Sequence, residues 1–229
     1  MASTALRVDA LNGAIGTELN LERDLRLPDR RVIPDATAGW RFTRRSSLEL
    51  NYIDLEREAN NVIDRTLHYG GVDFTFNTTI RTFSDLRTAS LIYRYKFVDA
   101  EAFSLSAHIG LHATRFAIGL SDQNTGASRS VDAQAPLPLA GLDAGFNAGA
   151  WRFNVEADYL KMTVNRIRGH LNKYTVSVMH PLGAGFSAEL GYTTYVLSLF
   201  GRRSTFTGDL RYAYQGPFLN LCYGCQPER

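Results

Sequence analysis

The stretch that decides the fold is Trp151-Arg152-Phe153-Asn154-Val155-Glu156-Ala157-Asp158-Tyr159. Every odd position in it is apolar, and Arg, Asn, Glu and Asp hold the even positions. A period of two indicates a β-strand with one apolar and one polar face. Charges on the polar face and aromatic rings at the ends of the apolar face are typical of a strand with lipid outside and water inside.

The same alternation recurs along most of the chain, between turns rich in Gly, Asn and Asp. The predicted strands cover residues 5–21, 32–43, 47–59, 77–97, 102–120, 135–147, 150–165, 169–182, 185–200 and 204–223. Connections between them are alternately short and long. The sequence therefore predicts an all-β, closed, antiparallel up-and-down transmembrane barrel of about ten strands. Eight and twelve strands stay open, because residues 60–85 are either one long hairpin or two further strands.

Length and composition set further bounds on the class of protein. The 229 residues form one predicted domain, 1–229, with a short tail outside the barrel at 224–229. The net charge of +2 and the lack of a basic block argue against nucleic acid as a partner. No run of about 20 apolar residues predicts a membrane helix. No secretory signal follows Met1, so we expect a mature form whose signal peptide has been removed, against a cytosolic chain.

At this point the chain resembles small outer-membrane β-barrel proteins of Gram-negative bacteria. Residues 40–50 carry the resemblance as a strand–turn–strand, together with residues 93–97 and 212–218. The resemblance implies the outer membrane as the location, and outer-membrane lipid, lipopolysaccharide and other envelope proteins as partners. Such proteins usually end in an aromatic residue, whereas here Tyr223 would be followed by six more residues. Members of this class include pores, structural barrels, adhesins and lipid-modifying enzymes.

Aromatic residues gather beside the short turns, as expected of a girdle at one membrane interface. The predicted girdle consists of Trp40, Phe42, Tyr95, Phe97, Phe103, Trp151, Phe153 and Phe186. The alternative is a soluble, lipocalin-like barrel, which would turn the apolar faces inward.

The polar faces of the strands carry acids and bases in similar numbers. Charges removed from water must be paired, so a mixed set predicts a cross-linked lumen, whereas an ion-selective pore favours one sign of charge. The predicted lumen network is Arg41, Glu49, Arg94, Lys96, Arg152, Glu156, Asp158, Lys173, Glu189, Asp209 and Arg211.

Three further polar residues are candidates for catalysis. His108 and His112 share one strand face about 13 Å apart, too far apart to bind one metal ion together. Asp143 on the next strand could pair with a histidine, as in general acid–base catalysis, or only hydrogen-bond within the lumen. Glu156 and Asp158 are also neighbours on one face, but Arg152 beside them favours a salt-bridge ladder.

Two smaller features complete the set of candidate sites. Cys222 and Cys225, as Cys-Tyr-Gly-Cys, are predicted to form a disulfide or to remain idle thiols, since no second pair completes a metal site. Basic loop residues could contact lipopolysaccharide phosphates; among them are Arg30, Arg57, Arg166, Arg168, Arg202 and Arg203.

The expected function is that of an integral outer-membrane barrel with a polar, mostly filled lumen, acting as a structural or interaction component of the envelope. A small-solute, porin-like pore is the first alternative. A membrane-embedded lipid or peptide hydrolase is the second. No cofactor or metal is expected.

Overall fold

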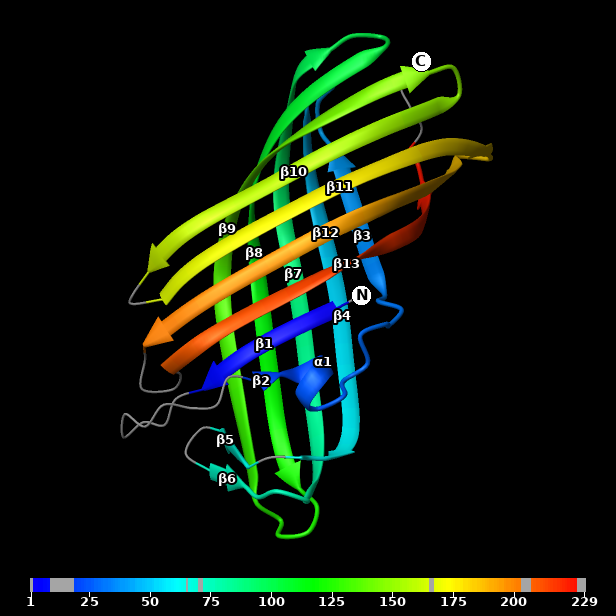
Figure 1. The fold of residues 1–229 in the computed structure, drawn as a ribbon. Helices are drawn as coiled ribbons and strands as arrows, with labels where there is room; N and C mark the ends of the chain where they lie inside the picture. Colours follow the sequence, from blue (N-terminus) through cyan, green and yellow to red (C-terminus); the bar gives the residue numbers. More distant parts are fainter. Residues whose placement is uncertain are drawn as a thin grey trace.

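The computed structural model describes residues 2–8, 19–64, 66–69, 72–164, 167–202 and 207–225. These residues are mostly antiparallel β-structure (Figure 1). One sheet holds eleven strands in the order β2-β1-β13-β12-β11-β10-β9-β8-β7-β4-β3, and β5 and β6 form a separate pair. The elements are β1 Ala2–Val8, β2 Leu19–Asn20, α1 Leu21–Asp24, β3 Asp35–Arg41, β4 Ser46–Val62, β5 Leu67–Tyr69, β6 Val72–Phe74, β7 Thr79–Asp99, β8 Phe103–Asp122, β9 Ser128–Ala148, β10 Trp151–Val164, β11 Ile167–Gly183, β12 Phe186–Arg202 and β13 Thr207–Tyr223.

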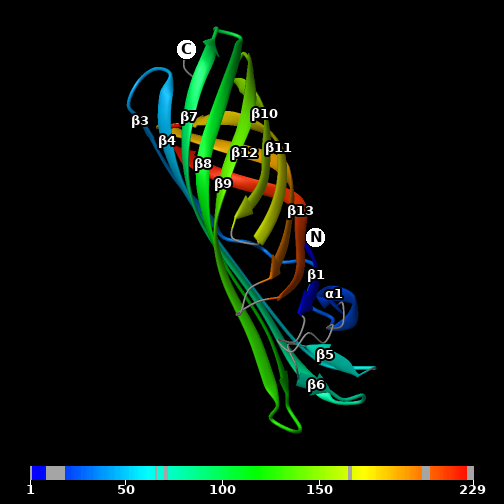
Figure 2. The same ribbon diagram turned by 90° about the vertical axis from the view of Figure 1, so that its left-hand side faces the viewer.

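The large sheet curls into a half-barrel with a concave inner face and a convex outer face (Figures 1 and 2). Tight turns join β3 to β4, β7 to β8, β9 to β10 and β11 to β12 at one end, which we call the turn end. Gly149 in one of these turns has a φ of +62°, a conformation that favours glycine. The all-β antiparallel prediction is confirmed. In the described part of the chain, β2 and β3 are the two edges of the sheet, so the sheet is open.

Nine of the ten predicted strands, from 32–43 onward, each overlap one strand of this sheet. The predicted strand 5–21 is wrong as a single strand. Its residues 9–18 lie outside the described chain, and α1 begins straight after Asn20, whose side-chain oxygen accepts a hydrogen bond from the Arg23 backbone N–H at 2.8 Å. Such a cap ends an extended segment and starts a helix. Between residues 60 and 85, β5 and β6 form a small hairpin outside the large sheet.

The polarity of the outer face reverses along the strands. On β7, the outer residues toward the turn end are apolar and exposed, namely Leu91, Tyr93, Tyr95 and Phe97. Toward the opposite end, which we call the loop end, the outer face carries Arg81, Asp85 and Arg87. The inner face reverses in the opposite sense, from Arg94 and Lys96 to the buried Leu86 and Ile80. On β7, the exposed apolar residues therefore lie outside in the turn-end half, whereas the buried apolar residues lie inside in the loop-end half.

The reversal falls at the same level on four neighbouring strands. Tyr52, Ala89, Ala113 and Pro136 pair with one another in sequence across β4, β7, β8 and β9, and form the last apolar row. Asp54, Arg87, Arg115 and Gln134 form the next outward-facing row. A single level shared by these four strands indicates a boundary between two environments across this part of the sheet.

Ion pairs cover the outer face beyond this boundary. Arg81 Nε lies 2.6 Å from Glu58 Oε1, and this hydrogen bond lowers the pKa of the exposed Glu58 carboxyl. Arg115 Nη2 lies 2.5 Å from Asp132 Oδ2, and Arg87 contacts both Asp54 and Glu56. A surface of paired, exposed charges is typical of a protein in water.

The inner face of the loop-end half holds the hydrophobic core. Residues on β2, α1 and the segment after it supply Leu19, Leu21, Leu25 and Leu27, which pack with the inner-facing residues Leu55, Ile80, Leu86, Phe116, Ile118 and Leu120. In Figures 1 and 2, β4, β7, β8 and β9 extend past the other long strands, and α1, β5 and β6 lie beside this extension. The extension is therefore built like a soluble domain.

The neighbouring strands β9 and β10 separate partway along the wall. Their pairing runs from Trp151 and Ala148 to Tyr159 and Ala140 and then ends. Beyond it, β10 continues to pair with β11, and β9 with β8. Pro136 and Pro138 lie in β9 just past the last pair, and proline has no N–H to donate. The β8 ladder continues alongside both prolines, which is consistent with the missing donors facing β10.

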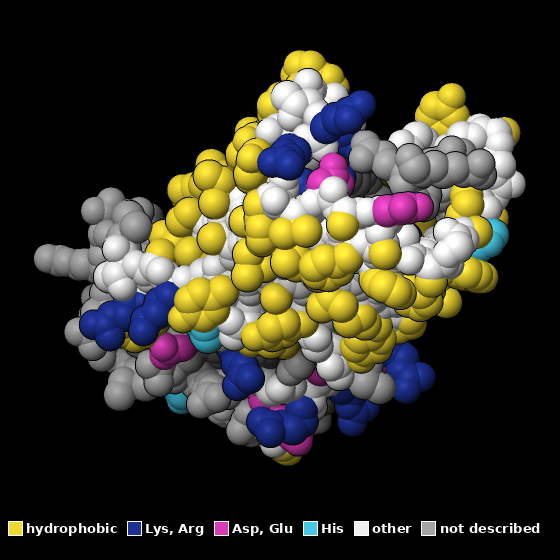
Figure 3. Space-filling view, turned by 90° about the horizontal axis from the view of Figure 1, so that it is seen from above, with side chains coloured by type: hydrophobic (Ala, Val, Ile, Leu, Met, Phe, Trp, Pro, Cys, Tyr) yellow, Lys and Arg dark blue, Asp and Glu magenta, His cyan; other side chains and the backbone are white. Residues whose placement is uncertain are grey.

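Figure 3, seen from the turn end, shows hydrophobic side chains across the middle of the visible surface, with charged side chains mostly at its margins. All eight predicted girdle residues, Trp40 and Phe42 among them, are exposed. They lie beside the short turns. No helix among the described residues is long and apolar enough to cross a membrane.

Candidate functional site

Six charged side chains form a closed ring on the inner face of the turn-end half. The ring alternates in sign and crosses five strands, from β7 to β11. In order it consists of Arg94, Asp143, His108, Asp158, Lys173 and Glu156, which returns to Arg94. Period-two alternation places all six on one face, and the registers of the strands bring them to one level.

The contacts on the β7 side are held by one guanidinium. Arg94 Nη1 lies 2.7 Å from Asp143 Oδ2, and Arg94 Nη2 lies 3.1 Å from Glu156 Oε2. Glu49 Oε2 approaches the same Nη2 at 3.7 Å from outside the ring. A planar fork with several donors is suited to binding carboxylates on different strands.

The contacts on the β11 side are held by one ammonium. Lys173 Nζ lies 2.7 Å from Glu156 Oε1 and 3.4 Å from Asp158 Oδ2. The other oxygen of Asp158 lies 2.5 Å from His108 Nε2, and His108 Nδ1 lies 3.4 Å from Asp143 Oδ2. Both imidazole nitrogens therefore face carboxylates, and an imidazole donates from both only when it is protonated. With His108 protonated, the ring has three positive and three negative groups.

Two glycines of β9 make room for these side chains. A Cβ on Gly141 would lie 2.3 Å from His108 Nε2 and 2.4 Å from Asp158 Oδ1. A Cβ on Gly145 would lie 2.2 Å from Arg152 Nη2. Arg152 itself donates to Ser104 Oγ, Asn147 Oδ1 and Asn154 Oδ1. Because a glycine has no side chain, the polar groups of the flanking strands can meet across the backbone of β9.

A metal ion could in principle use part of this ring. His108, Glu156 and Asp158 offer ligand atoms that lie within 4.8 Å of one another. However, the ammonium of Lys173 contacts both carboxylates, in the space that a cation would take. The charges of the ring are already balanced within it, which favours a structural role.

The second histidine has a different partner. His112 Nδ1 lies 2.7 Å from Ser90 Oγ, and its buried Nε2 has no hydrogen-bond partner among the described residues. A serine nucleophile needs a base that a third group orients, and Ser90 is only 2% exposed. This geometry therefore does not favour hydrolysis at Ser90. The predicted pairing of His108 with Asp143 is present, with Asp158 as the closer carboxylate.

Three of the remaining predicted lumen residues are Lys96, Glu189 and Arg41. Lys96 Nζ lies 3.0 Å from Asp99 Oδ1, and Glu189 accepts from Ser177 Oγ and Asn220 Nδ2. Arg41 is exposed at the end of the edge strand β3.

The assignment of Asp209 and Arg211 to the lumen is wrong. In the loop-end half the inner positions of β13 belong to Leu210, Tyr212 and Tyr214, two of them buried. Asp209 and Arg211 therefore alternate with them on the outer face, and Arg211 is exposed. The alternation of β13 was recognised correctly, but the reversal of polarity was not.

A buried ion pair between α1 and β4 was missed. Arg57 is only 2% exposed, its Nη1 lies 2.5 Å from Glu22 Oε1, and its guanidinium carbon lies 5.8 Å from the ring centre of Tyr212. The prediction that Arg57 is a loop residue facing lipopolysaccharide is therefore wrong. Its inward position follows from β4 continuing to Val62. Arg166 and Arg203 lie outside the described residues.

The two cysteines are joined. Cys222 and Cys225 form a disulfide with their Cα atoms 5.8 Å apart, at the turn end of β13. Of the predicted tail 224–229, residues 226–229 lie outside the described chain.

No known protein-family model matches this chain. No curated protein matches it either.

Proposed function

We propose that residues 1–229 form a single integral β-barrel of the outer membrane of a Gram-negative bacterium. Its lumen is filled by the charged ring, and it acts as a structural or interaction component of the envelope. The observation that carries the proposal is the reversal of polarity on the outer face, which falls at one row on β4, β7, β8 and β9. Lipid covers the exposed apolar residues of the turn-end half, and water covers the ion-paired outer face of the loop-end half.

The size of the apolar surface supports a lipid environment. Soluble monomers rarely expose a contiguous apolar patch larger than roughly 300–600 Å². Here exposed apolar side chains occupy the outer face of each strand from β7 to β13, including Ile109 at 63% and Leu219 at 76%. A lipocalin-like barrel would bury this face.

The height of the band fits the same environment. On β10 the apolar outer positions run from Trp151 to Tyr159. At about 3.3 Å per residue this is about 26 Å along the strand. A strand tilted by 35–45° would then contribute about 20 Å of height, close to the roughly 25 Å apolar band of outer-membrane barrels.

Closure is part of the proposal. In lipid, every backbone N–H and C=O needs a partner, so an open sheet edge is not stable at membrane depth. The proposed barrel therefore closes by pairing of the β3 edge with the opposite edge of the sheet, beside β1 and β13. This pairing is not among the strand pairs of the described residues.

The charged ring favours a filled lumen over a pore. An ion-conducting lumen needs water and commonly one sign of charge, whereas here Arg94 and Lys173 are each held by two or more carboxylates. Breaking this partly buried network leaves unpaired charge, at up to about 3–5 kcal/mol per partner removed.

Two measurements test this function. On a denaturing gel, the folded barrel should migrate differently before and after boiling, and the protein should remain with vesicles at high pH. In planar bilayers the wild-type protein should show no stable conductance. A steady conductance in the wild type would support the small-solute pore instead. A soluble protein with no heat shift would contradict both the structural barrel and the pore.

A further inference from the structure

The split between β9 and β10 opens beyond Tyr159, the last apolar outer residue of β10. The last paired residues are Tyr159 and Ala140. Beyond them, the backbones of β10 from Leu160 and of β9 before Ala140 no longer bond to each other. Their N–H and C=O groups along this gap need polar partners. At the level of lipid headgroups such partners are available.

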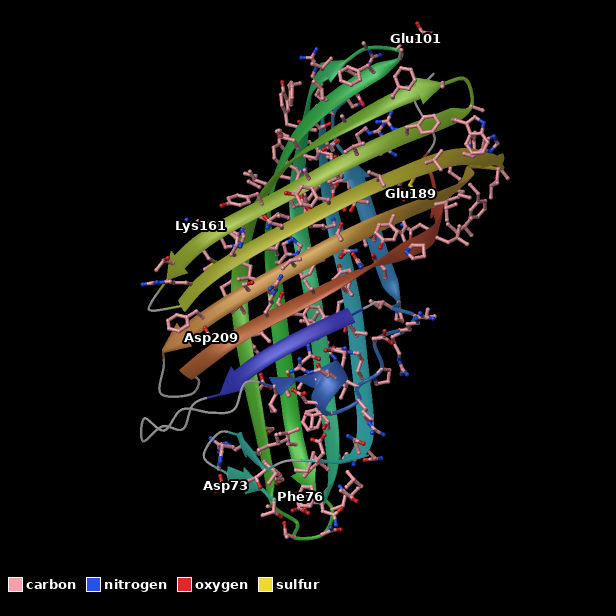
Figure 4. All side chains as sticks on the ribbon, viewed as in Figure 1. Asp73, Phe76, Glu101, Lys161, Glu189 and Asp209 are labelled. Atoms are coloured by element: carbon pink, nitrogen blue, oxygen red, sulfur yellow. A yellow bond between two sulfur atoms is a disulfide. The ribbon has the colours of Figure 1, made fainter. Side chains whose placement is uncertain are left out.

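Unpaired cations lie beside the split on the outer face. Lys161 of β10 pairs in register with His170 of β11, and Thr163 pairs with Arg168. Lys161 and Arg168 are thus diagonal neighbours, about 7–8 Å apart at their Cα atoms. Figure 4 shows Lys161 directed away from the sheet. Both side chains are exposed, and neither has a carboxylate partner within the described residues.

The outer face on the other side of the split is different. Arg81, Arg87 and Arg115 on β7 and β8 are each bound to a carboxylate. Unlike these three arginines, Lys161 and Arg168 have no carboxylate partner among the described residues, so both can meet an external anion. Tyr159, whose ring centre lies 5.6 Å from that of His170, marks the edge of the apolar band next to them.

We propose that the split holds one lipid A molecule of the outer leaflet, with its phosphate against Lys161 and Arg168. His170 and the open backbone of β10 add donors to the headgroup. The acyl chains lie over the exposed apolar outer residues Leu142 of β9 and Val155 and Tyr159 of β10. This inference rests on the proposed membrane location.

The residues on the two sides of the split, the cations of β10 and β11 and the prolines of β9, fit such a ligand. Guanidinium and ammonium groups form short, charge-assisted bonds with phosphate. A cation at an anionic membrane surface contributes on the order of 1 kcal/mol, which corresponds to about fivefold in affinity. Pro136 and Pro138 have no N–H to donate to β10, which is consistent with the two strands staying unpaired beyond Ala140.

The test compares matched double variants of the full chain in nanodiscs. Wild type, Lys161→Gln with Arg168→Gln, and the control Arg87→Gln with Arg115→Gln are reconstituted in phosphatidylcholine containing lipid A. Native mass spectrometry then counts lipid A molecules retained after release into detergent. We expect retention by wild type and by the control, and a loss of about 25-fold in affinity for Lys161→Gln with Arg168→Gln.

Three outcomes would overturn the lipid site. Equal retention by all three proteins would do so, as would no retention by the wild type. Displacement of lipid A by millimolar glycerol phosphate would show that the phosphate alone is bound. Each variant is first checked for the heat shift on gels. If the wild type itself fails to insert, the membrane barrel is wrong, whereas an inserted and heat-shifting protein with unchanged retention contradicts the lipid site alone.

Discussion

His108 of β8 and Asp158 of β10 meet at 2.5 Å, from Nε2 to Oδ1, across a strand to which neither belongs. Gly141 of β9 is the register partner of both. The contact is therefore made directly over the glycine. One residue without a side chain allows the ring to close across three strands.

Gly141→Ala should break this contact. The new Cβ would lie 2.3 Å from His108 Nε2, and the crowding should cost about 1–3 kcal/mol of unfolding free energy. Urea unfolding in vesicles, followed by the heat-shifted band on gels, measures the loss. The control is Gly39→Ala on β3, where the added Cβ has nothing within 4 Å. Equal stability of the two variants would contradict the packing described for the ring.

Lys173 and Glu156 should be strongly coupled. Lys173→Met leaves Glu156 and Asp158 with one cation fewer, and Glu156→Gln leaves Lys173 with Asp158 alone. A double-mutant cycle should give an interaction free energy of about 0.5–3 kcal/mol. The exposed pair Arg81 and Glu58 serves as the comparison, with an expected value of about 0–1 kcal/mol. Coupling no larger than in the exposed pair would mean that the ring is well hydrated.

Ile109→Lys should be costly only in a membrane. Ile109 is 63% exposed on the outer face, so in water the change would be close to neutral. Within lipid, a lysine near mid-depth of a barrel costs about 2–4 kcal/mol. Refolding yield into vesicles and urea midpoints measure the change, with Ala117→Lys on the same face beyond the boundary as the control. No difference between the two lysines would argue against lipid at Ile109.

Arg57→Met should destabilise the loop-end extension. The change removes the cation that lies 2.5 Å from the Glu22 carboxylate on α1, a side chain that is only 12% exposed. Removing one partner of a buried pair costs about 3–5 kcal/mol. Hydrogen exchange of the amides of α1 and β4 reports this region separately from the barrel. Arg81→Met, in an exposed pair, should leave the same amides protected to within about 1 kcal/mol.

The strands were predictable from the sequence, whereas the reversed polarity of their faces in the loop-end half was not. Period two fixed which residues share a face, and nine strands were located because their turns are rich in glycine, asparagine and aspartate. The assumption that one face is apolar over its full length failed on β13, where Tyr212 is buried and Arg211 exposed. The signal for the reversal was present, since Arg87 follows the same alternation as Leu91 but with opposite polarity.

The charged ring was predictable only as a set of residues. Alternation placed Arg94, Glu156 and Lys173 on polar faces, but their meeting depends on strand register, which a single sequence does not fix. The closer partner of His108 was missed because Asp158 lies two strands away across Gly141. Arg57 was misplaced because polar residues near its strand end looked like a loop.

The most direct test of the central claim is the environment on either side of the polarity boundary of β7. Single cysteines at Leu91 and at Arg81 carry a nitroxide label in the protein reconstituted in vesicles, and spin relaxation by oxygen and by a water-soluble nickel complex measures exposure to lipid and to water. Both positions face outward on one strand. The account predicts high oxygen and low nickel accessibility at position 91 and the reverse at position 81. Equal nickel accessibility at both positions would show that water covers the whole outer face, and would contradict the membrane barrel.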